Sequence, residues 1–224
     1  MTFSIVARTS DSLLFGVAIA SSSPAVAARC AWARAGVGAV ATQNITDPAL
    51  APEVLDELER GADAVPAVSR VLACNPYGAY RQLLAVGRRG APAVHSGAHA
   101  LGTAATSVSA HAAAAGNLLA LSAVPEVMTR VFEAQEGGLP ERLLTALRSG
   151  ARRGGEAGPI HSAGLLVVRD LAWPLVDLRV DWSDTDPIGE LEALWLRYAP
   201  QMEDYVIRAL NPQQAPPFGV PGDP

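Results

Sequence analysis

The order of strand-like and helix-like segments is the feature that most restricts how this chain can fold. Two apolar runs, residues 2–8 and 13–21, read as strands joined by a turn around Asp11 and Ser12. A short run of small and β-branched residues, 36–43, is typical of a buried strand and is expected to lie beside the first two. Helices then follow in groups and do not alternate one for one with strands, which predicts α+β layers.

The rest of the chain continues this pattern. Apolar residues at helical spacing predict helices within residues 47–61, 62–73, 127–131 and 139–147. Further strand-like runs cover residues 80–87, 92–95, 162–169 and 175–181. A last helix opens at Asp186-Pro187, and residues 103–121 have no clear period. Without an internal repeat or linker, we expect one domain over residues 1–210 and a loose Pro-rich tail over 211–224.

The basic residues exclude several kinds of site. All 17 are arginines, so a Schiff-base lysine, a P-loop lysine and a lysine general base are ruled out. A net charge of −5 gives no general attraction for nucleic acid. The adjacent pairs Arg88-Arg89 and Arg152-Arg153 are interpreted as loop surface, and no nucleic-acid partner is expected.

Membrane and metal sites are not indicated either. The longest uncharged stretch, residues 102–121, contains too many polar residues for a membrane span. The N-terminus lacks the pattern of a signal peptide, so we expect a cytoplasmic protein with no membrane partner. Cys30 and Cys74 form no CxxC motif, and Ser96-Gly97 breaks the spacing of His95 and His99, so no metal or other cofactor is expected.

Three longer stretches carry a resemblance to a known family. They read TFSIVAR at residues 2–8, WARAGVGAVATQ at 32–43 and SAGLLVV at 162–168. In this order they resemble the bacterial domain-of-unknown-function family 1028, over roughly residues 2–195. That family is similar in fold to the N-terminal-nucleophile (Ntn) hydrolases. The resemblance therefore implies a four-layer αββα sandwich, with two antiparallel sheets between helical layers, but it brings no settled activity.

The Ntn-like fold implies a nucleophile at the first residue that remains after processing. Its free α-amine acts as the base that activates its own hydroxyl, so no lysine is needed. Here that residue is Thr2, once Met1 has been removed; the alternative is that Thr2 is an ordinary strand residue. Arg34 is the candidate cation, which would lower a neighbouring pKa or bind a substrate carboxylate.

Polar residues at the ends of the expected strands are further candidates. Ser21, Ser22 and Ser23 end the second strand, where hydroxyls either face a cleft or serve as turn residues. Thr42 and Gln43 close the third strand and either bind substrate or find buried hydrogen-bond partners.

Three more residues could take part in the chemistry. Asn117 follows a glycine and is a candidate oxyanion donor or a turn residue. Glu156 and His161 lie in the loop before the strand at 162–169 and form a candidate acid/base pair or a solvated loop. This loop departs from the family pattern, as do Ala113–Ala115, which implies a less polar substrate or loss of the ancestral reaction.

Three hypotheses follow. The first is a small-molecule amide hydrolase or acyl transferase with Thr2 as nucleophile and Arg34, Gln43 and Asn117 around it. The second is a non-hydrolytic tailoring enzyme, such as a cyclase or isomerase, that keeps Met1 and uses Glu156 and His161. The third is a non-enzymatic small-molecule binder. The apolar, Ala-rich composition permits this third hypothesis, because exposed apolar patches drive self-association, and we expect a homo-oligomer.

Overall fold

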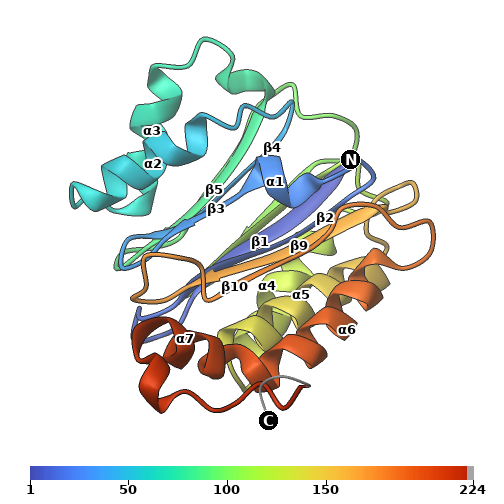
Figure 1. Cartoon of the computed structure of the whole chain (residues 1–224). Helices are drawn as coiled ribbons and strands as arrows, with labels where there is room; N and C mark the ends of the chain where they lie inside the picture. The colour runs from blue at the N-terminus through green and yellow to red at the C-terminus, as the bar shows by residue number, and fades with distance from the viewer. Residues whose placement is uncertain (221–224) are drawn as a thin grey trace.

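Residues 1–220 are described by a computed structural model of the chain (Figure 1). The strands are β1 Thr2–Arg8, β2 Phe15–Ser21, β3 Ala31–Arg34, β4 Gly38–Asn44, β5 Arg81–Gly87, β6 Ala93–Ser96, β7 Ala105–Val108, β8 Ala112–Asn117, β9 Ser162–Val168 and β10 Val176–Val180. Sheet A has the order β10-β9-β2-β1-β8-β7, and sheet B has the order β3-β4-β5-β6. Neighbouring strands are antiparallel in both sheets, which confirms the expected α+β class.

The α-helices are α1 Val26–Cys30, α2 Leu50–Glu59, α3 Ala64–Ala73, α4 Val124–Ala134, α5 Leu139–Arg152, α6 Pro187–Tyr198 and α7 Met202–Leu210. Helix α6 begins where Asp186-Pro187 predicted it, and the Asp186 side chain caps it by accepting the Gly189 N–H at 3.0 Å. None of the helices within residues 1–220 is long and apolar enough to cross a membrane.

Within residues 1–220, four apolar clusters hold the sheets and helices together, and the three larger ones between them involve both sheets. Helices α2 and α3 pack against β4 and β5, while α4 and α5 pack against sheet A on the other side of the molecule (Figure 1). Between the sheets, Val6 and Val17 of sheet A meet Ala41 and Leu84 of sheet B. Both faces of β1 are therefore buried, and all seven of its residues are inaccessible to solvent or nearly so.

The expectation that residues 36–43 lie beside the first two strands is wrong. Strand β4 pairs with β3 and β5 in sheet B and stacks face to face on β1 of sheet A. Within sheet B, a Cβ added at Gly38 would overlap the carbonyl oxygen of Val86 on β5, so the pairing of these two strands requires a glycine here.

The Pro-rich segment after α7 makes contacts as far as Phe218. Arg208 of α7 lies over the Phe218 ring at 3.8 Å from its centroid and donates a hydrogen bond to the Pro216 carbonyl at 3.1 Å. Residues 221–224 of the expected tail lie outside the described residues.

Candidate functional site

The N-terminal end of β1 brings together three of the predicted site residues. Thr2 lies directly opposite Ser21 of β2 on one side and Asn117 of β8 on the other. Residues opposite one another in an antiparallel sheet project from the same face. Since Ser4 and Val6 of that face meet sheet B, these three side chains lie at the same end of the space between the sheets.

Two hydroxyls of this group bind one carbonyl oxygen. Thr2 Oγ1 donates to the carbonyl oxygen of Met1 at 2.5 Å, and Ser21 Oγ donates to the same oxygen. The two hydroxyl oxygens lie 3.2 Å apart, and Ser21 Oγ is 2.9 Å from Ser23 Oγ. The site can therefore hold a carbonyl group with its oxygen between two hydroxyl donors.

Arg29, which sequence analysis did not single out, brings a guanidinium group to these hydroxyls. Its Nη2 donates to Ser23 Oγ at 3.1 Å, and its Nη1 donates to the carbonyl of Pro24 at 2.7 Å. Helix α1 turns the chain back after β2 and thereby brings Arg29 next to Ser23. Ala25, at the N-cap of α1, adopts the left-handed conformation with φ of 50° that this turn requires.

Arg34 is not part of this group. It lies opposite Gly38, at the end of β4 remote from Gln43, and five residues of strand separate these ends by roughly 17 Å. Its guanidinium pairs with Asp56 at 2.9 Å and Glu59 at 2.7 Å, both on α2. The predicted cation therefore links β3 to a helix on the outer face of sheet B.

A buried chain of amide groups continues from the Thr2 end into sheet B. Ser4 Oγ donates to Gln43 Oε1 at 2.6 Å, and Gln43 Nε2 donates to Gln82 Oε1 at 3.0 Å. Asn117 Nδ2 also donates to Gln82 Oε1, at 3.0 Å, and Gln82 Nε2 donates to Ser96 Oγ at 2.9 Å. Gln82 thus connects Asn117 of sheet A to Gln43 of sheet B and fixes the orientation of both side chains.

Thr42 lies outside this network. Successive residues of a strand point to opposite faces, so Thr42 projects toward α2 while Gln43 projects toward sheet A. Its hydroxyl donates to the Asp47 carbonyl at 3.2 Å and holds the start of the loop before α2.

Glu156 closes the site from the loop that follows α5. This residue is 5% exposed, and its carboxylate accepts the Ser22 N–H. Burial raises the pKa of Glu156 to about 7, while the α-amine of Met1 and the bonds from Ser22 act in the opposite direction. Glycines at positive φ, Gly154 at 134° and Gly155 at 56°, allow the turn that brings Glu156 back to β2.

His161 lies on the other side of Glu156, and both residues line a cavity of about 260 Å³. Its backbone N–H donates to the Ser21 carbonyl at 2.9 Å, and its ring stacks on Trp182 with centroids 4.2 Å apart. His161 Nδ1 lies 2.8 Å from the Ser183 carbonyl oxygen, so Nδ1 carries a proton and Nε2 is the nitrogen that can accept one.

The chain also bends sharply beside Asn117. Leu118 adopts φ of 49°, an unfavourable region for a leucine, and its N–H and carbonyl are held by hydrogen bonds to Leu101 and Ala157. The next residue, Leu119, forms an isolated antiparallel β-bridge with Glu156. Backbone strain therefore lies between two of the candidate residues, as is common at functional sites.

The histidines at 95 and 99 have separate structural contacts. His95 Nε2 lies 3.0 Å from the Gly78 carbonyl oxygen, and the His99 ring lies against Tyr80. Within residues 1–220, no three His, Cys, Asp or Glu side chains are grouped closely enough to hold a metal ion.

Sequence analysis missed Ser4, Gln82 and Arg29. Ser4 and Gln82 carried a usable signal, because each is an uncharged polar residue that lies beside the buried apolar run of its strand. Arg29 carried none, since its position depends on the short helix α1.

Comparisons with known proteins agree with the resemblance noted above. The model for the "Family of unknown function (DUF1028)" matches residues 2–191. A crystal structure of a DUF1028 protein from Silicibacter pomeroyi is 31% identical, with a TM-score of 0.81, and the match covers 88% of this chain and 89% of that chain. Anbu (ancestral β-subunit) from Yersinia bercovieri is 11% identical with a TM-score of 0.38, over 91% of this chain and 97% of Anbu. No curated protein matches the chain.

Proposed function

The chain belongs to the family of unknown function DUF1028, and from its own site we propose that it is a small-molecule amide hydrolase or acyl transferase with Thr2 as nucleophile. The carbonyl oxygen bound by Thr2 Oγ1 and Ser21 Oγ carries this proposal. Removal of Met1 would leave both hydroxyls available and would expose the α-amine of Thr2 beside its own hydroxyl.

The chemistry needs no lysine and no cofactor. The Thr2 α-amine takes the hydroxyl proton while Oγ1 bonds to the substrate carbonyl carbon. The C–N bond then breaks, and the leaving amine takes that proton. Water, or an acceptor amine in acyl transfer, attacks the resulting ester and restores the Thr2 hydroxyl.

Neighbouring side chains stabilise the charge that develops on the carbonyl oxygen. Ser21 donates to that oxygen, and Asn117 offers the N–H that it does not use on Gln82. Arg29 acts through the hydroxyls of Ser23 and Ser21, which are hydrogen-bonded to each other. A cation at the Ser23 end of this pair favours negative charge on the oxygen that Ser21 contacts.

Two broader features accompany the proposal. We assign the fold as a four-layer αββα sandwich of the Ntn-hydrolase kind, which the packing of helices against both sheets supports. We also propose a homo-oligomer, supported by exposed apolar residues of the C-terminal helices, such as Leu196 at 74% and Leu210 at 63% exposure.

The first experiment is the intact mass of untagged protein, followed by a panel of amides and lactams. We expect a mass without Met1 and turnover that Thr2→Ala abolishes and Thr2→Ser retains, because only the second keeps a hydroxyl next to the α-amine. Thr103→Ala is the matched control, since Thr103 is exposed and lies outside the site. Full activity in Thr2→Ala, or in protein that retains Met1, would refute the proposal.

A second candidate function rests on the cavity shared by Glu156 and His161. A carboxyl group with a pKa of about 7 that shares a cavity with an imidazole can move protons without a covalent intermediate, as a cyclase or isomerase requires. This candidate gains if His161→Ala abolishes turnover by Met1-retaining protein while Thr2→Ala leaves it unchanged.

A further inference from the structure

A second cavity, of about 530 Å³, lies on the helical side of sheet A, away from the Thr2 site. Its walls come from α4, α5 and α6, and its volume falls in the range of small-molecule sites. The α5 residues that line it, Thr145, Arg148, Ser149 and Arg152, follow the i, i+3, i+4, i+7 spacing of one helix face. We call this cavity the arginine groove.

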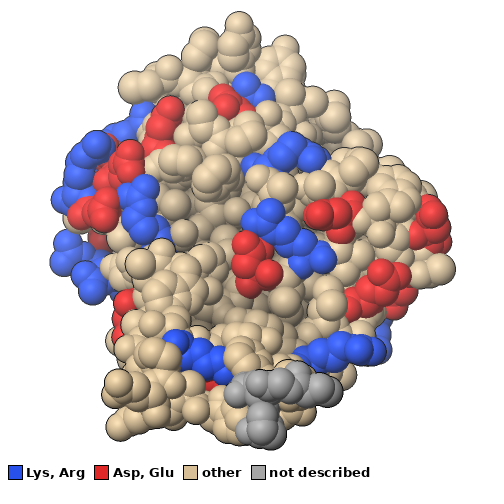
Figure 2. All heavy atoms as spheres, viewed as in Figure 1, with Lys and Arg blue, Asp and Glu red and all other residues tan. Residues whose placement is uncertain are grey.

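Three arginines of the groove have no acidic partner within residues 1–220. Arg130 of α4, Arg152 at the end of α5, and Arg153 after it are all exposed and make no ion pair in this part of the chain. Among the other thirteen arginines, seven make an ion pair, and basic and acidic side chains are interspersed at the left of the view in Figure 2. An excess of positive charge in a protein of net charge −5 therefore lies at this groove.

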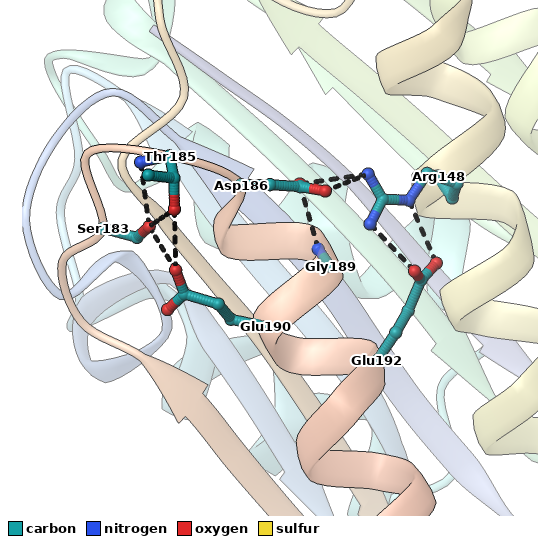
Figure 3. Close-up of polar contacts among 7 residues, drawn as sticks. All are labelled: Arg148, Ser183, Thr185, Asp186, Gly189, Glu190 and Glu192. Atoms are coloured by element: carbon teal, nitrogen blue, oxygen red, sulfur yellow. Dashed lines mark hydrogen bonds and ion pairs between the residues drawn. The ribbon is translucent and has the colours of Figure 1, made fainter.

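The fourth arginine of the groove, Arg148, pairs with acidic residues and holds two helices together. Arg148 donates to both carboxylate oxygens of Asp186, at 3.0 Å each, and to Glu192 at 3.1 and 2.8 Å, so it ties α5 to α6 (Figure 3). Glu192 is the acidic residue of the groove lining, and this pairing neutralises it. The three other guanidinium groups outweigh the roughly half negative charge at the C-terminal end of α5.

We propose that the arginine groove binds a small organic phosphate with at least two negative charges. Guanidinium groups match phosphate oxygens with paired N–H donors, and three of them around one groove favour more than one negative charge on the ligand. The Thr145 hydroxyl on the groove wall adds a further donor. The Thr2 chemistry plays no part in this proposal.

Calorimetric titration of the full chain with inorganic pyrophosphate tests it. We expect binding that weakens as salt is raised, and a Kd at least tenfold higher in the double variant Arg130→Gln/Arg153→Gln. Arg88→Gln is the matched control, because Arg88 is exposed and lies at the turn after β5, and its Kd should stay within twofold of the wild type. Far-UV circular dichroism and the thermal midpoint show whether the double variant is folded.

Three outcomes would overturn the proposal. One is no binding of pyrophosphate by the wild type at low salt, and another is equal loss of affinity in Arg88→Gln, which would indicate only general charge attraction. The third is that tricarballylate, or a single-stranded oligonucleotide, binds through Arg130 and Arg153 more tightly than pyrophosphate. Tighter binding of tricarballylate would assign the groove to a carboxylate ligand, and tighter binding of the oligonucleotide would assign it to a nucleic acid.

Discussion

The carboxylate of Glu156 accepts the backbone N–H of Ser22 through both of its oxygens, each at 3.1 Å. This contact joins the loop after α5 to the end of β2, across 134 residues of sequence. Burial of the carboxylate raises its pKa to about 7, although this contact with Ser22 acts in the opposite direction.

Glu156→Gln should stabilise the protein at high pH. Between the ordinary glutamate pKa and about 7, the folded state holds a proton that the unfolded state releases, so folding stability falls as pH rises. The unfolding free energy of Glu156→Gln minus that of the wild type should therefore increase by roughly 1–3 kcal/mol from pH 5 to pH 8. Denaturant unfolding at several pH values measures this difference.

Glu53→Gln is the control for that series, because Glu53 is exposed on α2. The unfolding free energy of Glu53→Gln minus that of the wild type should be the same at pH 5 and pH 8. A flat profile for Glu156→Gln as well would mean that Glu156 titrates as an ordinary exposed carboxyl group.

Gln82→Leu should destabilise the fold by about 2–4 kcal/mol, because three hydrogen bonds to buried groups and a fourth to the exposed Ser96 are lost. Without the Gln82 amide, the donors of Gln43 and Asn117 and the carbonyl of Gly116 lose their partner. Urea unfolding would measure the loss, with the exposed Gln135→Leu as the comparison. Equal stability of the two variants would show that water replaces the Gln82 amide.

Arg29→Gln should lower amide turnover about tenfold or more, while Arg34→Gln leaves it within twofold of the wild type. Arg29 bonds to Ser23 beside the hydroxyls, whereas Arg34 pairs with two carboxylates on α2. Steady-state kinetics on one amide substrate, with both variants checked for folding, compares them. If Arg34→Gln lowered amide turnover more than Arg29→Gln did, the cationic role would belong to Arg34.

Gly164→Ala should cost about 1–3 kcal/mol of stability and reduce activity. A Cβ at position 164 of β9 would overlap the Cβ of Ala27, so α1 must move away from sheet A. Arg29 lies on the same short helix and would move with it. Gly36→Ala is a control for activity alone, since Gly36 lies in the turn between β3 and β4 with open space around it, but its φ of 67° strains an alanine. Unfolding curves and amide turnover are the two measurements. Normal turnover by Gly164→Ala would show that the position of α1 does not affect catalysis.

Much of the strand and helix pattern could be predicted because its signals are local. The hairpin of β1 and β2 and the start of α6 at Asp186 follow from turn residues and caps within a few positions. Helix α1 and strand β3 were missed because four or five residues are too few for a period. The run Ala112–Ala115 has no polar alternation, so β8 could not be told from a helix.

Most of the residues that were predicted for the site, and that the fold brings together, stand at strand ends. Thr2, Ser21 and Gln43 are polar residues at the ends of apolar strands, and the fold brings those ends together. Arg34 precedes the strand that Gln43 ends, so the length of one strand already separates the two residues. The positions of Arg29 and Gln82 depend on packing between distant parts of the chain, which no local pattern reveals.

The position of β1 in the middle of sheet A also has a consequence for synthesis on the ribosome. Its neighbour β2 follows at once, but its other neighbour, β8, begins 104 positions after its own last residue, and β2 must wait for β9 at Ser162–Val168. Until then the nascent hairpin has two open edges, which can pair with other chains. We therefore expect folding to be completed late and to be slow, as is usual when the central strands pair across long stretches of chain.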